Sequence, residues 1–319
     1  MKTVFIVPTG IGAEIGGHAG DATPAFKLIA SLSDIAITHP NVVNASDINE
    51  MPENTWYVEG SMLDEFLWGQ RRLKKPLSNK ILLVVNSPVR PETVNAVNAA
   101  RHTIGCAIEI VELDEPFEMV GGFNADGSVG GEHSPVDALV SQVSGHTFDA
   151  LAMATEISVP KDVALNYMRS GGVNPWGGIE AIVSKAIAEE VGAPFAHAPI
   201  ENQDEDIMYF NEVVPSRIAA EAISMCYLHC VLKGLHKAPR IARDDDGIGS
   251  ESIDCLITPL NCFGEPHKAC IAKDIPIIAV KNKTCLSVET PYTYLAESYI
   301  EAAGYVSAIK AGVSPEVIK

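Results

Sequence analysis

Short, continuously apolar runs rich in β-branched residues alternate with helical stretches over most of the 319 residues. Runs of this kind are typical of strands that are buried on both faces. The expected strands are Thr3–Pro8, Ile35–Thr38, Ile81–Val85, Ala107–Val111, Ala150–Ala154, Phe195–Ala198, Cys255–Thr258 and Ile277–Val280. The alternation predicts an α/β fold with mainly parallel sheets and helices on both faces.

The expected helices fall between these strands, and most of them begin at a proline. Proline suits the first turn of a helix because its missing N–H would have no partner there. The expected helices are Pro24–Leu32, Ser61–Trp68, Pro91–Thr103, Pro135–Val143, Gly178–Val191, Pro215–Leu235, Pro266–Lys273 and Pro291–Ala303. Helix Pro215–Leu235 is apolar around much of its circumference, which favours either a homo-oligomer interface or a central buried helix.

One strand pattern recurs along the chain. Residues 34–41 and 254–261 both open with Asp, continue through an apolar run to Thr38 or Thr258, and end at Asn. Residues 149–155 repeat the pattern more loosely. The recurrence indicates a core built from related internal repeats, although ordinary helix–loop–strand spacing produces similar matches. In either case polar loops follow the strand ends, where small-molecule sites usually lie in α/β sheets.

A glycine-rich segment between Gly121 and Gly131 is the best candidate for a domain boundary. It predicts an N-terminal α/β unit over residues 1–125 and a C-terminal α/β unit over residues 126–319. We expect the two units to form one compact body with a cleft between them.

The net charge of −18 and the pI of about 4.8 argue against nucleic acid and anionic membrane surfaces as partners. No apolar run approaches the roughly 18 to 20 residues that a membrane-spanning helix needs. The N-terminal residues resemble a first strand more than a signal peptide. Seven scattered cysteines without a C-x-x-C pair fit free thiols in a reducing cytoplasm. We therefore expect a cytoplasmic protein whose partner is a small molecule.

The first glycine-rich loop connects a strand to a helix over residues 8–24 and carries Gly16, Gly17, His18 and Asp21. Glycines let backbone N–H groups approach a ligand closely, and a helix N-terminus favours an anion. The glycine spacing matches neither a dinucleotide fingerprint nor a phosphate-binding P-loop. The loop therefore favours a metabolite site over a nucleotide site.

Two later loops have a similar composition. Residues 170–180 place Asn174 and Trp176 between glycine pairs, where they would contact a bound molecule or form a structural turn. Residues 261–268 carry Glu265 and His267, which would flank a reacting group as acid and base, and Lys268, which would neutralise negative charge.

Histidines concentrate at the predicted strand ends. His39, followed by Asn41, and His197 occupy similar strand exits, and His18, His133 and His267 lie in loops. A lone histidine at such a position is usually a hydrogen-bonded structural residue, but several together indicate titrating groups or metal ligands. Neighbouring carboxylates leave a divalent metal as an open alternative.

These observations predict an enzyme that acts on a small polar or anionic metabolite by hydrolase or lyase chemistry in a cleft of glycine-rich loops. The expected catalytic residues are His18, Asp21, His39, His197, Glu265 and His267, and the expected substrate-binding residues are Gly16, Gly17, Asn41, Asn174, Trp176 and Lys268. The alternatives are a non-catalytic metabolite-binding or sensor protein and a nucleotide-dependent oxidoreductase.

Four strings in the chain carry a resemblance to a known family. They are GGHAGDATP, THPNVVNASDINEMP, GGVNPWGGIEA and FAHAP. They resemble a bacterial family, found notably in cyanobacteria, that is classed as a domain of unknown function. The resemblance covers nearly the whole chain and implies a single self-contained unit, without assigning a reaction or a catalytic residue.

Overall fold

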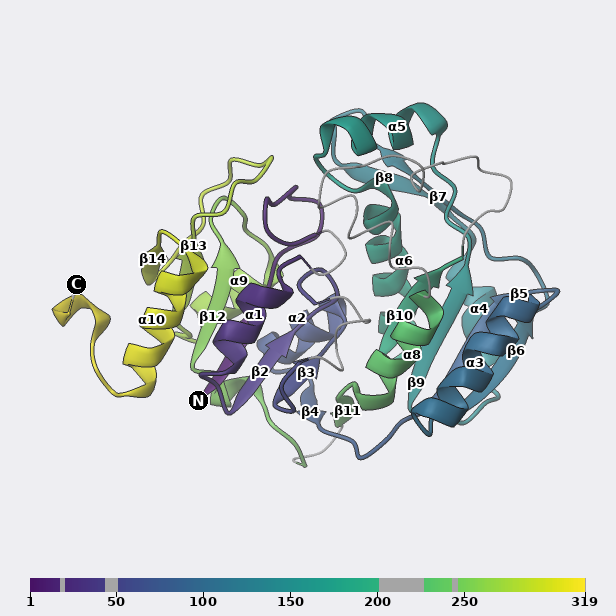
Figure 1. Ribbon diagram of the computed structural model, residues 1–319, viewed down its shortest axis with the longest axis horizontal. Coiled ribbons are helices and arrows are strands. Elements are labelled where there is room, and N and C mark those ends of the chain that lie inside the picture. The colour runs from purple at the N-terminus through teal and green to yellow at the C-terminus, as the bar shows by residue number, and fades with distance from the viewer. Residues whose placement is uncertain (18–20, 44–50, 201–226, 243–245, 319) are drawn as a thin grey trace.

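The computed structural model describes residues 1–17, 21–43, 51–200, 227–242 and 246–318. Two parallel sheets organise the fold (Figure 1). The six-stranded sheet has the order β14-β13-β12-β1-β2-β3, and the four-stranded sheet has the order β10-β9-β5-β6. All pairs within these two sheets are parallel, which confirms the α/β expectation.

The strand bounds follow the apolar runs closely. The six-stranded sheet contains β1 (Lys2–Phe5), β2 (Ile35–Thr38), β3 (Thr55–Tyr57), β12 (Cys255–Pro259), β13 (Ile277–Val280) and β14 (Tyr294–Ala296). The four-stranded sheet contains β5 (Lys80–Asn86), β6 (Ala107–Leu113), β9 (Ala150–Thr155) and β10 (Phe195–Pro199). All eight expected strands therefore belong to one of the two parallel sheets.

Alternate residues of each central strand enter two different cores, because successive side chains point to opposite faces. In β1, Phe5 belongs to one buried cluster and Val4 to the other. In β5, Leu83 and Leu82 divide in the same way. The strands are therefore covered on both faces, which is why their sequences are continuously apolar.

Helices supply the covering layers on both faces of both sheets. On the six-stranded sheet, α1 (Thr23–Ala30) and α10 (Tyr299–Lys310) contribute to one cluster, and α2 (Gly60–Trp68) and α9 (Glu265–Ala272) contribute to the other. On the four-stranded sheet, α3 (Pro91–Thr103) and α8 (Tyr227–Lys237) lie opposite α4 (Val136–Val143) and α6 (Pro175–Val191). This arrangement confirms the expectation of helices on both faces.

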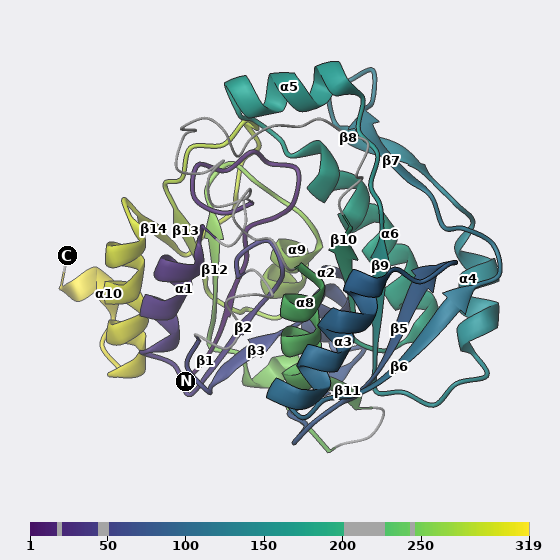
Figure 2. The same cartoon turned by 45° about the vertical axis from the view of Figure 1, so that its right-hand side comes forward.

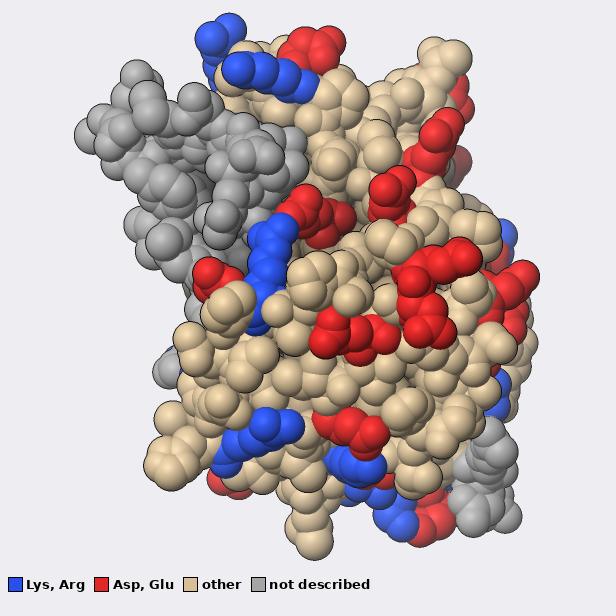
Figure 3. Space-filling view, turned by 90° about the vertical axis from the view of Figure 1, so that its right-hand side faces the viewer, with Lys and Arg blue, Asp and Glu red and all other residues tan. Residues whose placement is uncertain are grey.

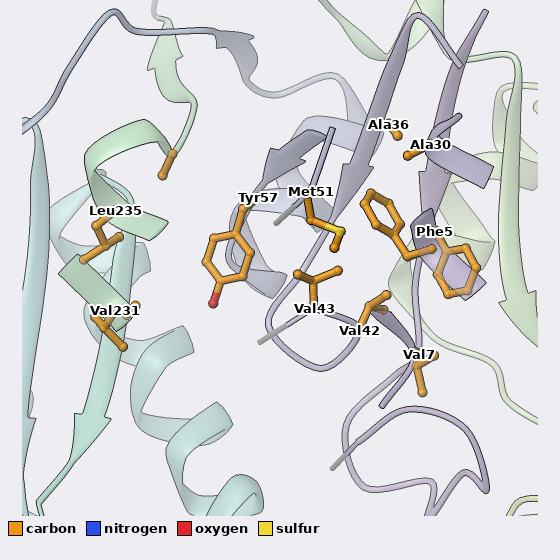
Figure 4. Packing of buried hydrophobic residues seen from close by; sticks show 14 of the residues in the cluster. Phe5, Val7, Ala30, Ala36, Val42, Val43, Met51, Tyr57, Val231 and Leu235 are labelled. Atoms are coloured by element: carbon orange, nitrogen blue, oxygen red, sulfur yellow. The ribbon is translucent and has the colours of Figure 1, made fainter. Parts of the chain in front are cut away.

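The two sheets share their cores. Figure 4 shows Tyr57 of β3 reaching from the six-stranded sheet toward Val231 and Leu235 of α8, with Met51 beside it. On the opposite face, α2 packs against α6. The buried apolar residues of both sheets are therefore continuous.

The two chain ends combine in one sheet, because Thr3 of β1 pairs with Cys255 of β12. The four-stranded sheet comes from the middle of the chain, residues 80–199. Both expected halves, 1–125 and 126–319, contribute strands to both sheets. The loops that follow β1, β6 and β9 lie on the same side of the molecule, the upper side in Figures 1 and 2.

Several segments were not expected from the sequence or have other bounds than expected. The glycine-rich segment Gly121–Gly131 lies within a β-hairpin of β7 (Met119–Phe123) and β8 (Val129–His133), which packs on α6. The expected helix from Pro291 is wrong at its start, since β14 comes first and α10 begins only after its N-cap Ser298. Helix α5 (Lys161–Ser170) and the antiparallel pair β4 (Arg72–Lys74) and β11 (Arg240–Ala242) were not expected.

The expected helix Pro215–Leu235 lies outside the described residues up to 226, and its remainder forms α8. Among the described helices, none combines the length and the apolar character needed to cross a membrane.

Candidate active site

A cavity of about 540 Å³ opens at the carboxyl edge of the four-stranded sheet. The chain leaves β5 toward β6 on one side and leaves β9 toward β10 on the other, so the direction of winding reverses between β5 and β9. Parallel sheets bind ligands outside such a reversal point. The ends of these two strands line the cavity through Asn86 and Thr155. Its position and volume are those of a small-molecule site.

The segment before β7 forms one wall of the cavity, and Asn86 holds it in place. The Asn86 amide oxygen accepts from the Phe117 N–H at 2.8 Å, and its amide nitrogen donates to the Phe117 carbonyl at 3.1 Å. The backbone N–H of Ser158 then donates to the Met119 carbonyl at 2.9 Å. These bonds fix the wall against the ends of β5 and β9.

Thr155, the last residue of β9, is the inner end of a hydrogen-bonded chain. Its Oγ1 lies 3.0 Å from Nε2 of His197, the third residue of β10. His197 Nδ1 lies 2.8 Å from Oε1 of Glu180 on α6. A carboxylate can only accept, so Nδ1 carries the imidazole proton and Nε2 accepts from the Thr155 hydroxyl.

Burial differs along this chain in a way that matters for proton transfer. The His197 side chain is 0% exposed and Glu180 is 32% exposed, whereas Thr155 lines the cavity. The imidazole is therefore shielded from bulk water, and Thr155, which it contacts, lines the cavity although it is only 1% exposed. A hydroxyl, a base and an orienting carboxylate in this order are the parts of a nucleophile-activating triad.

Helix α6 positions Glu180 through two local features. The Asn174 side chain caps the helix by accepting from the backbone N–H of Trp176 at 3.0 Å. One turn later, a Cβ on Gly178 would lie 1.6 Å from Cγ1 of Val129 in the hairpin. Only glycine lets the helix and the hairpin approach so closely, which explains why position 178 is a glycine.

Three charged residues line the cavity together with Thr155. The Arg90 guanidinium, at the start of α3, is hydrogen-bonded to the carboxylate of Glu156, the residue after Thr155. Glu118, on the wall that precedes β7, also lines the cavity. The cavity thus combines a nucleophile-like hydroxyl with charged groups from three different loops.

The six-stranded sheet contains a similar threonine–histidine pair with a different environment. Thr258 Oγ1 lies 3.0 Å from Nε2 of His267, the same separation as at Thr155. His267 is 0% exposed, its Nδ1 accepts from the Gly264 N–H at 3.1 Å, and burial lowers its pKa to about 4. This neutral imidazole holds the start of α9 and does not line the cavity. A catalytic role for His267 stays a prediction.

His39 also has a buried structural environment. Its Nε2 accepts from the Val7 N–H at 3.1 Å, and burial lowers its pKa to about 4. Asn41 donates to the Val7 carbonyl at 2.7 Å and accepts the Gly17 N–H at its own carbonyl at 3.0 Å. The end of β1 is therefore tied to the end of β2, and the expected acid–base role of His39 stays a prediction.

The first glycine-rich loop is held mainly by contacts with other loops. Gly16 has a φ of +101°, and its N–H donates to Asp21 Oδ1 at 2.7 Å. A Cβ on Gly12 would lie 3.5 Å from the carbonyl carbon of Gly172, so the first and second loops adjoin. His18 lies outside the described residues.

The remaining expected site residues make local contacts away from the cavity. Glu265 accepts from Lys268 at 2.6 Å and from the Trp68 indole N–H at 3.1 Å on the surface of α9. The Lys268 hydrogen bond is the main reason why the pKa of Glu265 is lowered. Trp176 packs edge-on against Tyr167, with ring centroids 6.0 Å apart.

Comparison with known proteins agrees with the family resemblance that the four sequence strings indicate. A family model described as a protein of unknown function (DUF3326) matches residues 2–319. The chain belongs to the DUF3326 family. An uncharacterized lipoprotein of Synechococcus sp. (strain ATCC 27144 / PCC 6301 / SAUG 1402/1) is 34% identical over 341 residues, which cover 100% of this chain and 93% of that protein. No solved structure matches the chain. The resemblance to an uncharacterised bacterial family is thus confirmed.

Membership of the DUF3326 family assigns no reaction, so residue roles rest on geometry. Of the expected site residues, His197 belongs to the hydrogen-bonded chain at the cavity. Sequence reasoning missed Thr155, Glu180 and Arg90 as site residues. A signal existed for Thr155, because it closes the loosest copy of the recurring strand pattern. Within the described ranges, no group of three His, Cys, Asp or Glu side chains is arranged to hold a metal ion.

Proposed function

We propose that the protein is a hydrolase that cleaves a small polar metabolite bound in the cavity at the carboxyl edge of the four-stranded sheet. Thr155 would act as the nucleophile, His197 as the general base and Glu180 as the group that orients the imidazole. The observation that supports the proposal most directly is Thr155, which lines the cavity and whose hydroxyl is hydrogen-bonded to the buried His197, itself hydrogen-bonded to Glu180.

The chemistry follows from the tautomer that Glu180 imposes. Thr155 Oγ1 attacks a substrate carbonyl carbon while its proton passes to Nε2 of His197, and the imidazolium that forms is stabilised by Glu180. When the carbonyl–leaving-group bond breaks, Nε2 returns this proton to the leaving group. Water then attacks the Thr155 ester, His197 accepts a proton from the water, and the threonine hydroxyl is restored. General-base assistance of this type contributes about 10²- to 10⁴-fold in rate.

A test needs a substrate source and a matched control. We suggest incubating purified protein with a low-molecular-weight metabolite extract in H₂¹⁸O and following consumption and products by mass spectrometry. Thr155→Val removes the hydroxyl at nearly constant volume, and His197→Gln removes the base. Thr258→Val is the control, because it deletes a threonine–histidine hydrogen bond of the same 3.0 Å length away from the cavity, where His267 Nε2 donates and the threonine hydroxyl accepts.

The expected result is turnover by the wild type and by Thr258→Val, with a loss of about 10²-fold or more in Thr155→Val and His197→Gln. Thr155→Val should lose about 1 kcal/mol of stability with its one side-chain hydrogen bond, and Thr258→Val should lose at least as much, because Thr258 Oγ1 also lies 3.5 Å from Cys262 Sγ. One ¹⁸O in the product identifies hydrolysis, whereas cleavage without ¹⁸O identifies a lyase. Undiminished turnover in Thr155→Val would contradict the proposal, and specific binding without any product would indicate a sensor.

We also propose that the reaction takes place in the cytoplasm. The described cysteines are all free thiols, which supports a reducing compartment. The Synechococcus relative carries the name lipoprotein, and a lipid anchor on this protein would place it at a membrane instead. Cell fractionation followed by immunoblotting distinguishes the two locations, since an anchored form sediments with the membranes.

A further inference from the structure

The charges of the described residues that line the cavity do not sum to zero. The charged residues among them are Arg90, Glu118 and Glu156. The guanidinium of Arg90 is paired with the Glu156 carboxylate. Glu118 lines the wall before β7, and no Lys or Arg within the described ranges forms an ion pair with it. Among the described residues, one negative charge at the cavity therefore has no ion-pair partner.

The surrounding surface has the same sign. Figure 3 views the side of the molecule that carries α3, α4 and β6, and Asp and Glu side chains gather across its middle. Asp114 and Glu115, which follow β6, are exposed. A surface of one sign raises the local concentration of ligands of the opposite sign and lowers that of like-charged ligands. The field at the cavity thus favours cations.

The pairing of Arg90 also disfavours an anion. A phosphate or carboxylate that recruited the guanidinium would have to displace Glu156, and the freed carboxylate would then lie beside Glu118 and the anion itself. A protonated amine meets the opposite situation, because it can donate to Glu118 and Glu156 without breaking the existing pair. Each of these contacts would be a charge-assisted hydrogen bond.

We infer that the substrate of the proposed hydrolase is a small primary amine, with the ammonium group held by Glu118 and Glu156 near the carbonyl that Thr155 attacks. An amino-acid amide or ester has both groups in one small molecule. Apolar lining residues such as Val85, Phe117 and Ile200 would contact a short aliphatic side chain. This inference rests on the proposed function and replaces the broader expectation of a polar or anionic metabolite.

Binding can be tested separately from turnover by using the Thr155→Val variant, which keeps all three charges but lacks the nucleophile. The probes are norvalinamide, which carries an ammonium group, pentanamide, which lacks it, and glutaramate, which carries a carboxylate. Isothermal titration calorimetry at about pH 6.5 should give the tightest binding for norvalinamide, by about tenfold or more over pentanamide. This preference should disappear at about pH 9.5, where the α-amino group is neutral.

Variants of the carboxylates identify the groups responsible. Glu118→Gln should remove much of the norvalinamide preference while leaving the Arg90–Glu156 pair intact. Glu156→Gln should also reduce the preference, because it removes a carboxylate and breaks that ion pair. Glu115→Gln is the matched control, because it removes a nearby exposed charge that does not line the cavity. An unchanged preference in both Glu118→Gln and Glu156→Gln would overturn the assignment. Equal or tighter binding of pentanamide or glutaramate, or no binding of any probe at about 10 mM, would also overturn it.

Failure of this inference can be told from failure of the proposed function. Norvalinamide binding that depends on Glu118, together with no turnover by the wild type, would support the preference for an ammonium group and refute the proposed hydrolase activity. If the protein hydrolyses only uncharged or anionic compounds and does so through Thr155, the hydrolase activity would be supported and the preference for an ammonium group would be refuted.

Discussion

The close contact between α6 and the β7–β8 hairpin predicts that one added methyl group, at position 178, destabilises the protein. In Gly178→Ala, the new Cβ would lie 1.6 Å from Cγ1 of Val129 and 2.8 Å from its Cβ. Rotation of the valine side chain moves Cγ1 but not Cβ, so the clash cannot be relieved by a rotamer change. The hairpin must move away from the helix.

Two opposing effects set the size of the loss. Alanine is favoured over glycine in a helix interior by up to about 1 kcal/mol. Overpacking a tight contact costs about 1–3 kcal/mol, and the upper half of this range applies where backbone has to shift. We therefore expect Gly178→Ala to lower the free energy of unfolding by about 1–2 kcal/mol. Because α6 carries Glu180, the shift should also lengthen the Glu180–His197 contact and reduce turnover.

Gly304 supplies the matched control. It lies within α10, and a Cβ built on it meets nothing within 4 Å. Gly304→Ala should therefore raise stability by about 0.5–1 kcal/mol. Urea unfolding followed by circular dichroism, compared at the midpoints, should move the two variants in opposite directions. If Gly178→Ala is as stable as the wild type or more stable, the close approach of helix and hairpin is wrong.

Two further predictions concern titration and reactivity. Burial raises the pKa of Asp64 to about 7, with Lys185 opposing the shift. A carboxyl group with a raised pKa in the folded state stabilises the protein at low pH, so the stability of the wild type relative to Asp64→Asn should fall between about pH 4 and 7 and then level off. Thermal melting of both proteins across this pH range measures their difference in stability. A difference that does not change with pH would refute the raised pKa of Asp64. Cys285 is exposed, whereas Cys255 and Cys270 are buried and burial raises the pKa of Cys270 to about 12. Iodoacetamide should label Cys285 in the folded protein well before the other two, as followed by peptide mass mapping; equal labelling rates would contradict their burial.

The central strands could be predicted because a strand that is buried on both faces has apolar residues at nearly every position, which gives a continuous apolar run in the sequence. Strands β2 and β13 have the expected bounds, Ile35–Thr38 and Ile277–Val280. The edge strands β3 and β14 are only three residues long and have partly exposed residues, so neither produces an apolar run. Helix α5 was missed because its sequence, KDVALNYMRS, is dominated by exposed polar residues.

The candidate site was predictable only in part, because its key contacts join elements that are distant in the sequence. The histidine at the end of β10 was identified from its position at a strand end. Its carboxylate partner lies 17 residues earlier on α6, and no local pattern indicates that this helix turn faces the end of β10. The two Thr–His pairs have the same separation but different partners: Thr155 lines the cavity and its histidine contacts Glu180, whereas Thr258 does not line the cavity and its histidine accepts from the Gly264 N–H.

The pairing of β1 with β12 has a consequence for how the protein is made. The two strands are 252 residues apart, so at ordinary translation rates β1 leaves the ribosome on the order of ten to fifty seconds before its neighbour. During that interval one edge of β1, with the apolar side chains of Val4 and Phe5, has no native strand beside it. A nascent chain with such an open edge is prone to pair with the wrong strand, and the cell must keep it apart from others until synthesis is nearly complete.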